Sequence, residues 1–379
     1  MTSSARRALS SVGSALQGAI AVMVPRWACP LRGPPVRGAS AGRAIRGRRM
    51  ADQGFGERTA AALARHGARV VLAVRDVPAG EQAADGIRKY APRAALGVRR
   101  LDLASLSSVR EFAAELTADH PAIDLLVNNA GVVLLGERRT TVDGFELHFA
   151  TNVLGHFALT GLLLDALDRA ELARVVHLSS LSHKKAVLDF HDLMSEKDFD
   201  ASRTYGRSKL ATTAFGLELD RRLRASRARI TSVLAHPGLT STNLTPRAWE
   251  NHGFMGGVAA RLFLLRTRSV ERGVLPQLYA ATAPGVSGGL FFGPSGRGER
   301  RGHVAEVRPS AEAADPTVGR RLWTAAQDLT VSAPFDRTPP PGTSQDARIG
   351  AARASRPMPC RSHGGPTGCA PSQPLLTGS

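Results

Sequence analysis

The chain alternates short apolar runs with longer stretches in which apolar residues recur every three or four positions. The runs predict buried strands near residues 68–74, 96–103, 123–131, 173–180, 228–238 and 288–294. The periodic stretches predict helices near residues 57–67, 79–91, 105–120, 144–167, 204–225 and 269–283. Short apolar strands spaced by amphipathic helices are typical of parallel βαβ units, so we predict an α/β fold with a doubly wound parallel sheet. Such sheets bind ligands beyond the carboxyl ends of their strands.

Composition separates a central domain from two unusual flanks. Residues 1–49 hold nine arginines and no acidic residue, and residues 334–379 are rich in Pro, Gly, Ser and Arg. The flanks carry most of the formal net charge of +18, so this charge does not indicate a nucleic-acid-binding domain. We predict one domain over residues 50–333, between a disordered, non-native-looking N-terminal flank and a disordered tail.

Cysteine usage and hydropathy bear on the cellular setting. Cys29, Cys360 and Cys369 all lie in the flanks, so the central domain offers neither a disulfide framework nor a cysteine–zinc site. We therefore expect a reducing, cytoplasmic setting and no metal. No run of 18 apolar residues exists, which predicts no transmembrane helix. The short apolar stretch Ala15–Val24 follows two arginines, so a signal or transit peptide remains an alternative origin of the flank.

A Tyr-x-x-x-Lys pattern is the first sign of chemistry. Tyr205 and Lys209 share one face of a predicted helix, because an i, i+4 spacing brings two side chains together. An ammonium near a phenol favours the phenolate and lowers the pKa of the tyrosine. A tyrosine tuned in this way can give a proton to a carbonyl or accept one from an alcohol. For this motif alone, a surface pair without function is the alternative.

Further polar groups lie at strand ends or on the helix that follows. Ser179 and Ser180 end one predicted strand, where either hydroxyl can bond a substrate oxygen or cap the next segment. The stretch Val127–Gly131 ends another strand, where small residues let a cofactor approach. Asn152 lies on the following predicted helix, where a contact inside the helix layer is the alternative.

Taken in order, these motifs resemble the short-chain dehydrogenase/reductase family. Along the chain stand Gly-x-Gly at a helix start, Asp-Leu, Asn-Asn-Ala-Gly, an asparagine-bearing helix, Ser-Ser, Tyr-x-x-x-Lys and His-Pro-Gly-x-x-x-Thr. The resemblance runs from about Gly54 to Trp323. Within the family, the stretches "NVLGHFALTGLLL", "VVHLSSLSHKK" and "YGRSKLA" look most like the retinol-dehydrogenase-like branch.

The resemblance implies a Rossmann-like fold and a role for each matched residue. Tyr205 would be the acid/base, Lys209 would lower its pKa and hold the nicotinamide ribose, and Ser180 would orient the substrate carbonyl. Asn152 would anchor a water that links Lys209 to solvent. The implied cofactor contacts, besides Tyr205 and Lys209, are Gly54, Gly56, Asp102, Leu103, Asn128, Asn129, Ala130, Gly131, Pro237, Gly238 and Thr242.

The end of the second family strand bears on the choice of cofactor. An acidic residue there would bind the ribose 2′-hydroxyl of NAD. This strand ends in Val74-Arg75, and Arg75 is placed to pair with the 2′-phosphate of NADP. Asp76 is the alternative, because a shift of one residue would bring its carboxylate near the ribose. We expect NADP(H) rather than NAD(H), and a reaction that interconverts a carbonyl and an alcohol on a small or lipophilic substrate.

The front of the cofactor loop departs from the family pattern, which is Thr-Gly-x-x-x-Gly-x-Gly after an apolar strand. Gly54 and Gly56 match the last two glycines, but Met50 stands at the first and "GRAIRGR" stands in place of the strand. The stretch Ala19–Val24 is apolar but comes too early in the chain. We therefore predict a sheet without its first strand. A cofactor-impaired, inactive homologue and a binder of nucleic acid or membrane surfaces through the basic flanks remain alternatives.

Overall fold

A mixed, mainly parallel sheet with helices on both faces organises the described part of the chain. The computed structural model describes residues 20–23, 54–133, 136–240 and 269–330, which belong to one unit, Met1–Asp336. Among these residues, eight strands form one sheet in the order β3-β2-β1-β4-β5-β6-β7-β8. Their bounds are β1 Ile20–Met23, β2 Arg69–Val74, β3 Leu96–Arg100, β4 Leu125–Asn128, β5 Ala173–Leu178, β6 Ile230–Ala235, β7 Phe291–Pro294 and β8 Val304–Glu306. The predicted doubly wound α/β fold is confirmed.

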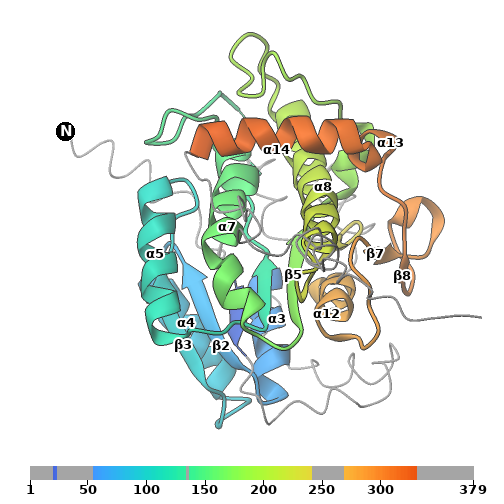
Figure 1. The fold of residues 1–379 in the computed structure, drawn as a ribbon. Helices are drawn as coiled ribbons and strands as arrows, with labels where there is room; N and C mark the ends of the chain where they lie inside the picture. The colour runs from blue at the N-terminus through green and yellow to red at the C-terminus, as the bar shows by residue number, and fades with distance from the viewer. Residues whose placement is uncertain (1–19, 24–53, 134–135, 241–268, 331–379) are drawn as a thin grey trace, which may run out of the picture. The chain divides into compact units, whose positions relative to one another are not determined.

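Helices form two layers (Figure 1). One layer holds α5 (Leu106–Asp119), α7 (Gly155–Asp168) and α8 (Ala201–Ala225). The other layer holds α3 (Phe55–Arg65), α4 (Val77–Arg88) and α12 (Leu275–Thr282). The shorter elements are α6 Leu147–Phe149, η1 Ala150–Leu154, η2 Leu181–Lys185, α11 Val270–Gly273 and η4 Arg297–Glu299.

Two apolar clusters bury the two faces of the sheet. Along β2, Val71 and Ala73 lie in the cluster under α5, α7 and α8, whereas Val70 and Leu72 lie in the cluster under α3, α4 and α12. Successive side chains of a strand point to opposite faces. Because both faces are covered, the strand is apolar at every position from Val70 to Val74, which explains the continuous run in the sequence.

The structure adds elements beyond those that the sequence pattern predicted. They are β8, α13 (Ala311–Ala314) and α14 (Pro316–Thr330), and α14 lies across α7 and α8 in Figure 1. Trp323 of α14 is buried, with its ring centre 5.1 Å from that of Phe157 and 5.9 Å from that of Phe215. These aromatic contacts attach α14 to the helix layer.

At the centre of the sheet the structure differs from the sequence prediction. β1 lies between β2 and β4 and runs antiparallel to both, with Ile20 opposite Leu72 and Val127. The prediction of a sheet without a strand at this place is therefore wrong. The physical reason is that β2 and β4 would otherwise leave backbone N–H and C=O groups unpaired inside a buried sheet, and this apolar stretch can pair with them. The other residues of the flank 1–49 lie outside the described residues. Met50 and the tail 334–379 lie outside them as well.

One helical segment of the described residues is long and apolar enough to span a membrane, judged by length and composition alone. The helical stretch Leu147–Asp168 has a mean hydropathy of 1.3 over an 18-residue window, but 89% of that window is buried inside the protein. The segment comprises α6, η1 and α7, and it packs against the sheet and α5. A helix that is apolar on all sides is expected in the core of a large α/β layer.

Candidate functional site

The predicted lysine and asparagine meet beside the loop that follows β4. Lys209 Nζ donates to the carbonyl oxygen of Leu178, at the end of β5, over 3.0 Å. A Cβ added to Gly131 would lie 3.2 Å from both Lys209 Nζ and Asn152 Oδ1. The glycine therefore leaves the space in which these two polar groups come together. Tyr205 lies one turn before Lys209 on α8, with its ring centre 6.0 Å from Lys209 Nζ.

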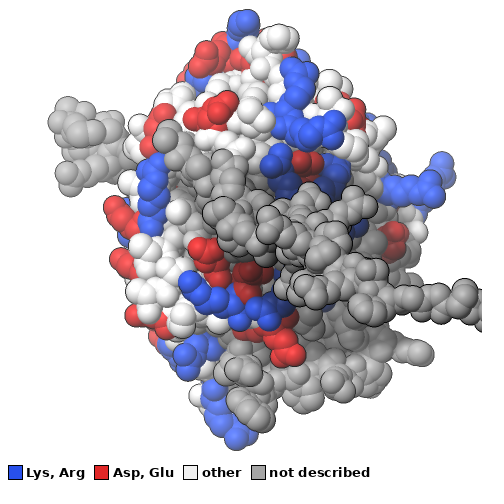
Figure 2. Space-filling view, in the orientation of Figure 1, with Lys and Arg blue, Asp and Glu red and all other residues white. Residues whose placement is uncertain are grey.

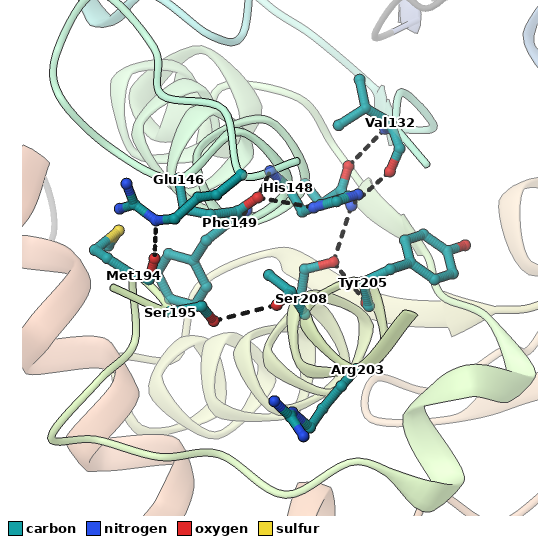
Figure 3. A network of polar contacts seen from close by, with 12 residues as sticks. Val132, Glu146, His148, Phe149, Met194, Ser195, Arg203, Tyr205 and Ser208 are labelled. Carbon is teal, nitrogen blue, oxygen red and sulfur yellow. Dashed lines mark hydrogen bonds and ion pairs between the residues drawn. The ribbon is translucent and has the colours of Figure 1, made fainter. Parts of the chain in front are cut away.

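Asn152 fixes the loop after β4 against α8 through bonds to Val132 and Ser208, which are labelled in Figure 3. Its Oδ1 accepts from the Val132 amide (2.8 Å), and its Nδ2 donates to the Val132 carbonyl (3.2 Å) and to Ser208 Oγ (2.9 Å). The residue lies in η1, a five-residue π-helical segment between α6 and α7. Such π-helical turns are rare and frequently mark functional sites. The side chain is buried and acts as a bridge between the two segments.

The two serines after β5 have different surroundings. Ser179 is buried, and its hydroxyl lies 2.7 Å from Thr213 Oγ1 of α8. Ser180 is more exposed and caps η2, where its Oγ accepts from the Ser182 amide over 3.3 Å. The Ser180 hydroxyl also lies close enough to the phenol of Tyr205 to lower its pKa. Between the two serines, this geometry favours Ser180 as the one that meets a substrate beside the tyrosine.

Burial controls the protonation of the tyrosine and the lysine. Burial lowers the pKa of Lys209 to about 8. Burial raises the pKa of Tyr205, and the hydrogen bond from Ser180 lowers it in part. Lys209 is not among the causes that shift the pKa of Tyr205; its ammonium bonds the Leu178 carbonyl and stands 6.0 Å from the ring centre. Both shifts favour the uncharged form, and an uncharged phenol is the form that donates a proton to a carbonyl.

A buried Glu–His pair lies next to Tyr205 and was missed by the sequence analysis (Figure 3). His148 Nδ1 is 2.8 Å from Glu146 Oε1, and both residues are 1% exposed. Glu146 also accepts from the amides of His148 and Phe149, so it caps α6. The His148 and Tyr205 rings meet edge to face, with centres 6.2 Å apart. The acidic residue before a helix was the available sequence signal.

The predicted cofactor residues lie largely along the carboxyl edge of the sheet. Those that follow or end β3, β4 and β6 are Asp102, Leu103, Asn129, Ala130, Gly131, Pro237 and Gly238. Gly54 is the N-cap of α3 and has no side chain to cap the helix, and Gly56 lies in its first turn. Thr242 lies outside the described residues.

Asn128 occupies a different position from its neighbours. Its Nδ2 donates to Thr160 Oγ1 (3.0 Å) and lies 3.3 Å from His177 Nδ1, and the residue is 1% exposed. Its side chain therefore connects β4 to α7 and β5. Asn129 in turn accepts from Gln277 Nε2 over 3.2 Å, and the same nitrogen donates to Thr59 Oγ1 of α3 over 3.1 Å. Gln277 lies on α12, far from Asn129 in the sequence, so no local sequence pattern predicted this contact.

Arg75 and Asp76 differ in their availability to a ligand. Asp76 is the N-cap of α4, and its Oδ1 accepts from the Ala79 amide over 3.0 Å. Arg75 is exposed directly after β2 and makes no ion pair with any residue that the structure describes. The acidic alternative is thus engaged in capping, whereas the arginine is available. In the described part of the chain, no cluster of His, Cys, Asp or Glu has the size needed to hold a metal ion.

Comparison with known proteins extends these observations. The family model of the short chain dehydrogenase matches residues 50–253. Retinol dehydrogenase 13 of Mus musculus is 39% identical over 284 residues, which cover 74% of this chain and 81% of that protein. Retinol dehydrogenase 11 of Homo sapiens is 38% identical over 281 residues, covering 74% and 83%.

Solved structures give the same picture. An uncharacterized protein from Mycobacterium Paratuberculosis has 35% identity and a TM-score of 0.60, covering 74% of this chain and 91% of that chain. The Pseudomonas aeruginosa RhlG/NADP active-site complex has 25% identity and a TM-score of 0.50, covering 63% and 89%.

Proposed function

This chain belongs to the short-chain dehydrogenase family, and we propose that it interconverts a carbonyl and an alcohol with NADP(H) as the hydride carrier. The chain is a retinol-dehydrogenase-like oxidoreductase by its similarity to the curated relatives. Their names refer to retinol, a lipophilic alcohol, so we propose a lipophilic alcohol and the matching aldehyde or ketone as the substrate pair. The proximity of Ser180 and Lys209 to Tyr205 carries the proposal.

The residues present fit a nicotinamide cofactor. The N-cap of α3 is Gly54, whose lack of a side chain leaves room for a pyrophosphate to approach the helix start. Gly131 leaves open the space beside Lys209 that a larger residue would fill. When bound, the cofactor supplies or accepts the hydride. Lys209 and the small residues after β4 would hold its ribose and nicotinamide end.

Tyr205 is the proposed acid/base. In the reducing direction its uncharged phenol gives a proton to the carbonyl oxygen, and the Ser180 hydroxyl donates a hydrogen bond to the same oxygen. In the oxidising direction the phenolate form of Tyr205 takes the proton of the alcohol and becomes the neutral phenol. Asn152 keeps the loop after β4 against α8, and so maintains the position of Lys209 relative to Gly131.

A Tyr205→Phe variant tests this assignment. The ring stays and only the proton is lost, so turnover should fall 10²–10⁴-fold, as is typical for an acid/base group, while the Kd for NADPH changes only a few fold. Tyr279→Phe is the matched control, since Tyr279 lies on α12, away from α8. A Tyr205→Phe protein that keeps more than about a tenth of the wild-type rate would contradict the assignment.

The preference for NADP(H) rests on Arg75. A charge-assisted bond to a phosphate is worth about 1.5–3 kcal/mol, so Arg75→Ala should weaken NADPH binding by roughly 10- to 150-fold and NADH binding far less. Arg93→Ala serves as the control, because Arg93 is an exposed arginine between α4 and β3. Equal losses for both cofactors would show that Arg75 does not bind the 2′-phosphate.

A cofactor-impaired homologue is the second candidate, and the direction of β1 favours it. The family's cofactor loop leaves the carboxyl end of a parallel strand. Here β1 is antiparallel, so Met23 at its end lies opposite Arg69, at the edge where β2 begins. Fluorescence titration of the wild-type chain with NADPH distinguishes the two candidates, because only the first binds it.

The remaining sequence predictions on partners and location are part of this proposal. On the face shown in Figure 2, lysine and arginine side chains are mixed with aspartate and glutamate, which supports a small-molecule rather than a nucleic-acid partner. A cytoplasmic location is supported by the restriction of cysteine to the flanks.

A further inference from the structure

A second polar network joins three segments at the carboxyl edge of the sheet. The segments are η2 after β5, the residues that follow β6, and η4 after β7. His236 Nδ1 accepts from the Gly238 amide (3.1 Å), and His236 Nε2 lies 3.0 Å from Glu299 Oε2. Glu299 Oε1 accepts from Lys184 Nζ over 2.6 Å. The order of contacts is therefore Gly238, His236, Glu299, Lys184.

These contacts fix the protonation of each member. Because His236 Nδ1 accepts a hydrogen bond, the neutral imidazole carries its proton on Nε2 and donates it to Glu299. Burial lowers the pKa of His236, and the Glu299 hydrogen bond opposes this in part. Burial tends to raise the pKa of Glu299, but the bonds from His236 and Lys184 hold it at about 2. At neutral pH the network thus holds a neutral histidine, a carboxylate and an ammonium.

The backbone of the Glu299 segment packs on the same glycine. A Cβ added to Gly238 would lie 2.8 Å from the Arg300 carbonyl oxygen and 3.0 Å from that of Glu299. Leu239 N donates to the Arg300 carbonyl over 3.1 Å. Glu299 itself has a φ of +55°, a left-handed conformation that residues other than glycine adopt only at a cost. Its two side-chain bonds offset that cost and hold the segment in place.

We propose that Glu299 and His236 are positioning residues for the turn Pro237–Gly238, and that Lys184 ties this turn to the segment that begins at Ser180. Ser180 is the N-cap of η2, and Lys184 belongs to the same short helix. Neither Glu299 nor His236 touches the reacting atoms. They fix the position of the Gly238 amide relative to Ser180. The inference rests on the proposed function, in which this turn meets the nicotinamide end of the cofactor.

The first test is Glu299→Gln, which keeps the size of the side chain and removes its charge. Hydrogen bonds to a charged group are worth about tenfold or more in an equilibrium constant, so the Kd for NADPH should rise about tenfold. At saturating NADPH, kcat should stay within about threefold, since a positioning residue of this kind affects cofactor binding rather than the proton transfer. Glu306→Gln is the control, because Glu306 is exposed on the neighbouring strand β8.

A second measurement separates positioning from a general loss of stability. Asparagine at position 236 keeps an acceptor for the Gly238 amide but is too short to reach Glu299. His236→Asn combined with Glu299→Gln should therefore weaken NADPH binding by less than the sum of the two single losses, because both changes weaken the same contact. Lys184→Met removes the other end of the network at an exposed position, and should weaken NADPH binding even if Glu299→Gln fails to fold.

The outcomes are distinct. Wild-type protein that binds no NADPH would refute the proposed function and, with it, the role of this turn. Wild-type protein that binds NADPH with a Kd unchanged by Glu299→Gln or Lys184→Met, measured well below the melting temperature, would refute the positioning role alone. Additive losses in the double variant would show that His236 and Glu299 act separately.

Discussion

Replacing Lys209 by methionine should stabilise the folded protein while abolishing its activity. Methionine keeps an unbranched chain of similar length but carries no charge. The Lys209 side chain is buried, its ammonium bonds the Leu178 carbonyl, and no carboxylate of the described residues pairs with it. The ammonium is therefore held in a place that disfavours its charge.

The pKa of Lys209 sets the size of the effect. Burial lowers it from 10.5 to about 8, and one pKa unit corresponds to about 1.4 kcal/mol. Keeping the side chain charged in the folded state at pH 7 thus costs roughly 3 kcal/mol. Losing the hydrogen bond to Leu178 costs about 1 kcal/mol. The Lys209→Met variant should consequently gain about 2 kcal/mol in free energy of unfolding.

The pH dependence provides a sharper test. Because the folded-state pKa is below the unfolded-state value, the folded protein loses this proton first as the pH rises. Between about pH 8 and pH 10.5 the unfolded state binds more protons, so this group makes the wild type more stable by about 1.4 kcal/mol per pH unit. The methionine variant lacks this gain. The stability advantage of the variant should therefore shrink across this window.

Urea unfolding without cofactor, at pH 7 and in steps to pH 10.5, measures both quantities. Titration of all other groups cancels in the difference between the two proteins. Lys89→Met is the control, because Lys89 is exposed at the end of α4 and should give no comparable gain. A Lys209→Met protein less stable than wild type, or a difference that stays constant with pH, would refute the argument from burial.

Three further perturbations test other parts of the structure. Gly155→Ala should destabilise the protein by about 1–3 kcal/mol in urea and weaken NADPH binding, because the added Cβ would lie 2.4 Å from the Leu103 carbonyl oxygen. Val22→Pro should lower the melting temperature, since proline removes a backbone donor from a strand paired on both sides; an unchanged melt would argue against β1. Ser180→Ala should lower kcat with little effect on melting, whereas Ser179→Ala should lower the melting temperature more than kcat, because its hydroxyl bonds α8. The reverse pattern in the two serine variants would exchange their roles.

The sequence by itself determined the features that depend on local pattern. A short continuous apolar run such as Val70–Val74, between helical patterns, predicts a strand covered on both sides, so the doubly wound sheet followed from periodicity and run length. The Tyr205–Lys209 pair also followed, because both residues lie on one helix and their spacing fixes their common face. Arg75 and Asp76 were placed correctly at the end of a strand, since that strand had been predicted.

Only the tertiary structure decided which of two adjacent polar residues is held by the protein and which is available to a ligand. Asp76 is engaged because it caps α4, and Ser179 because Thr213 of α8 lies beside it. The place of Ile20–Met23 depended on two strands, β2 and β4, that need a partner between them. His236 and Glu299 are 63 positions apart, and only the folding of β7 back beside β6 brings them together. Local periodicity cannot predict such contacts, because they depend on which distant segments pack together. They also depend on which buried polar groups then need a hydrogen-bond partner.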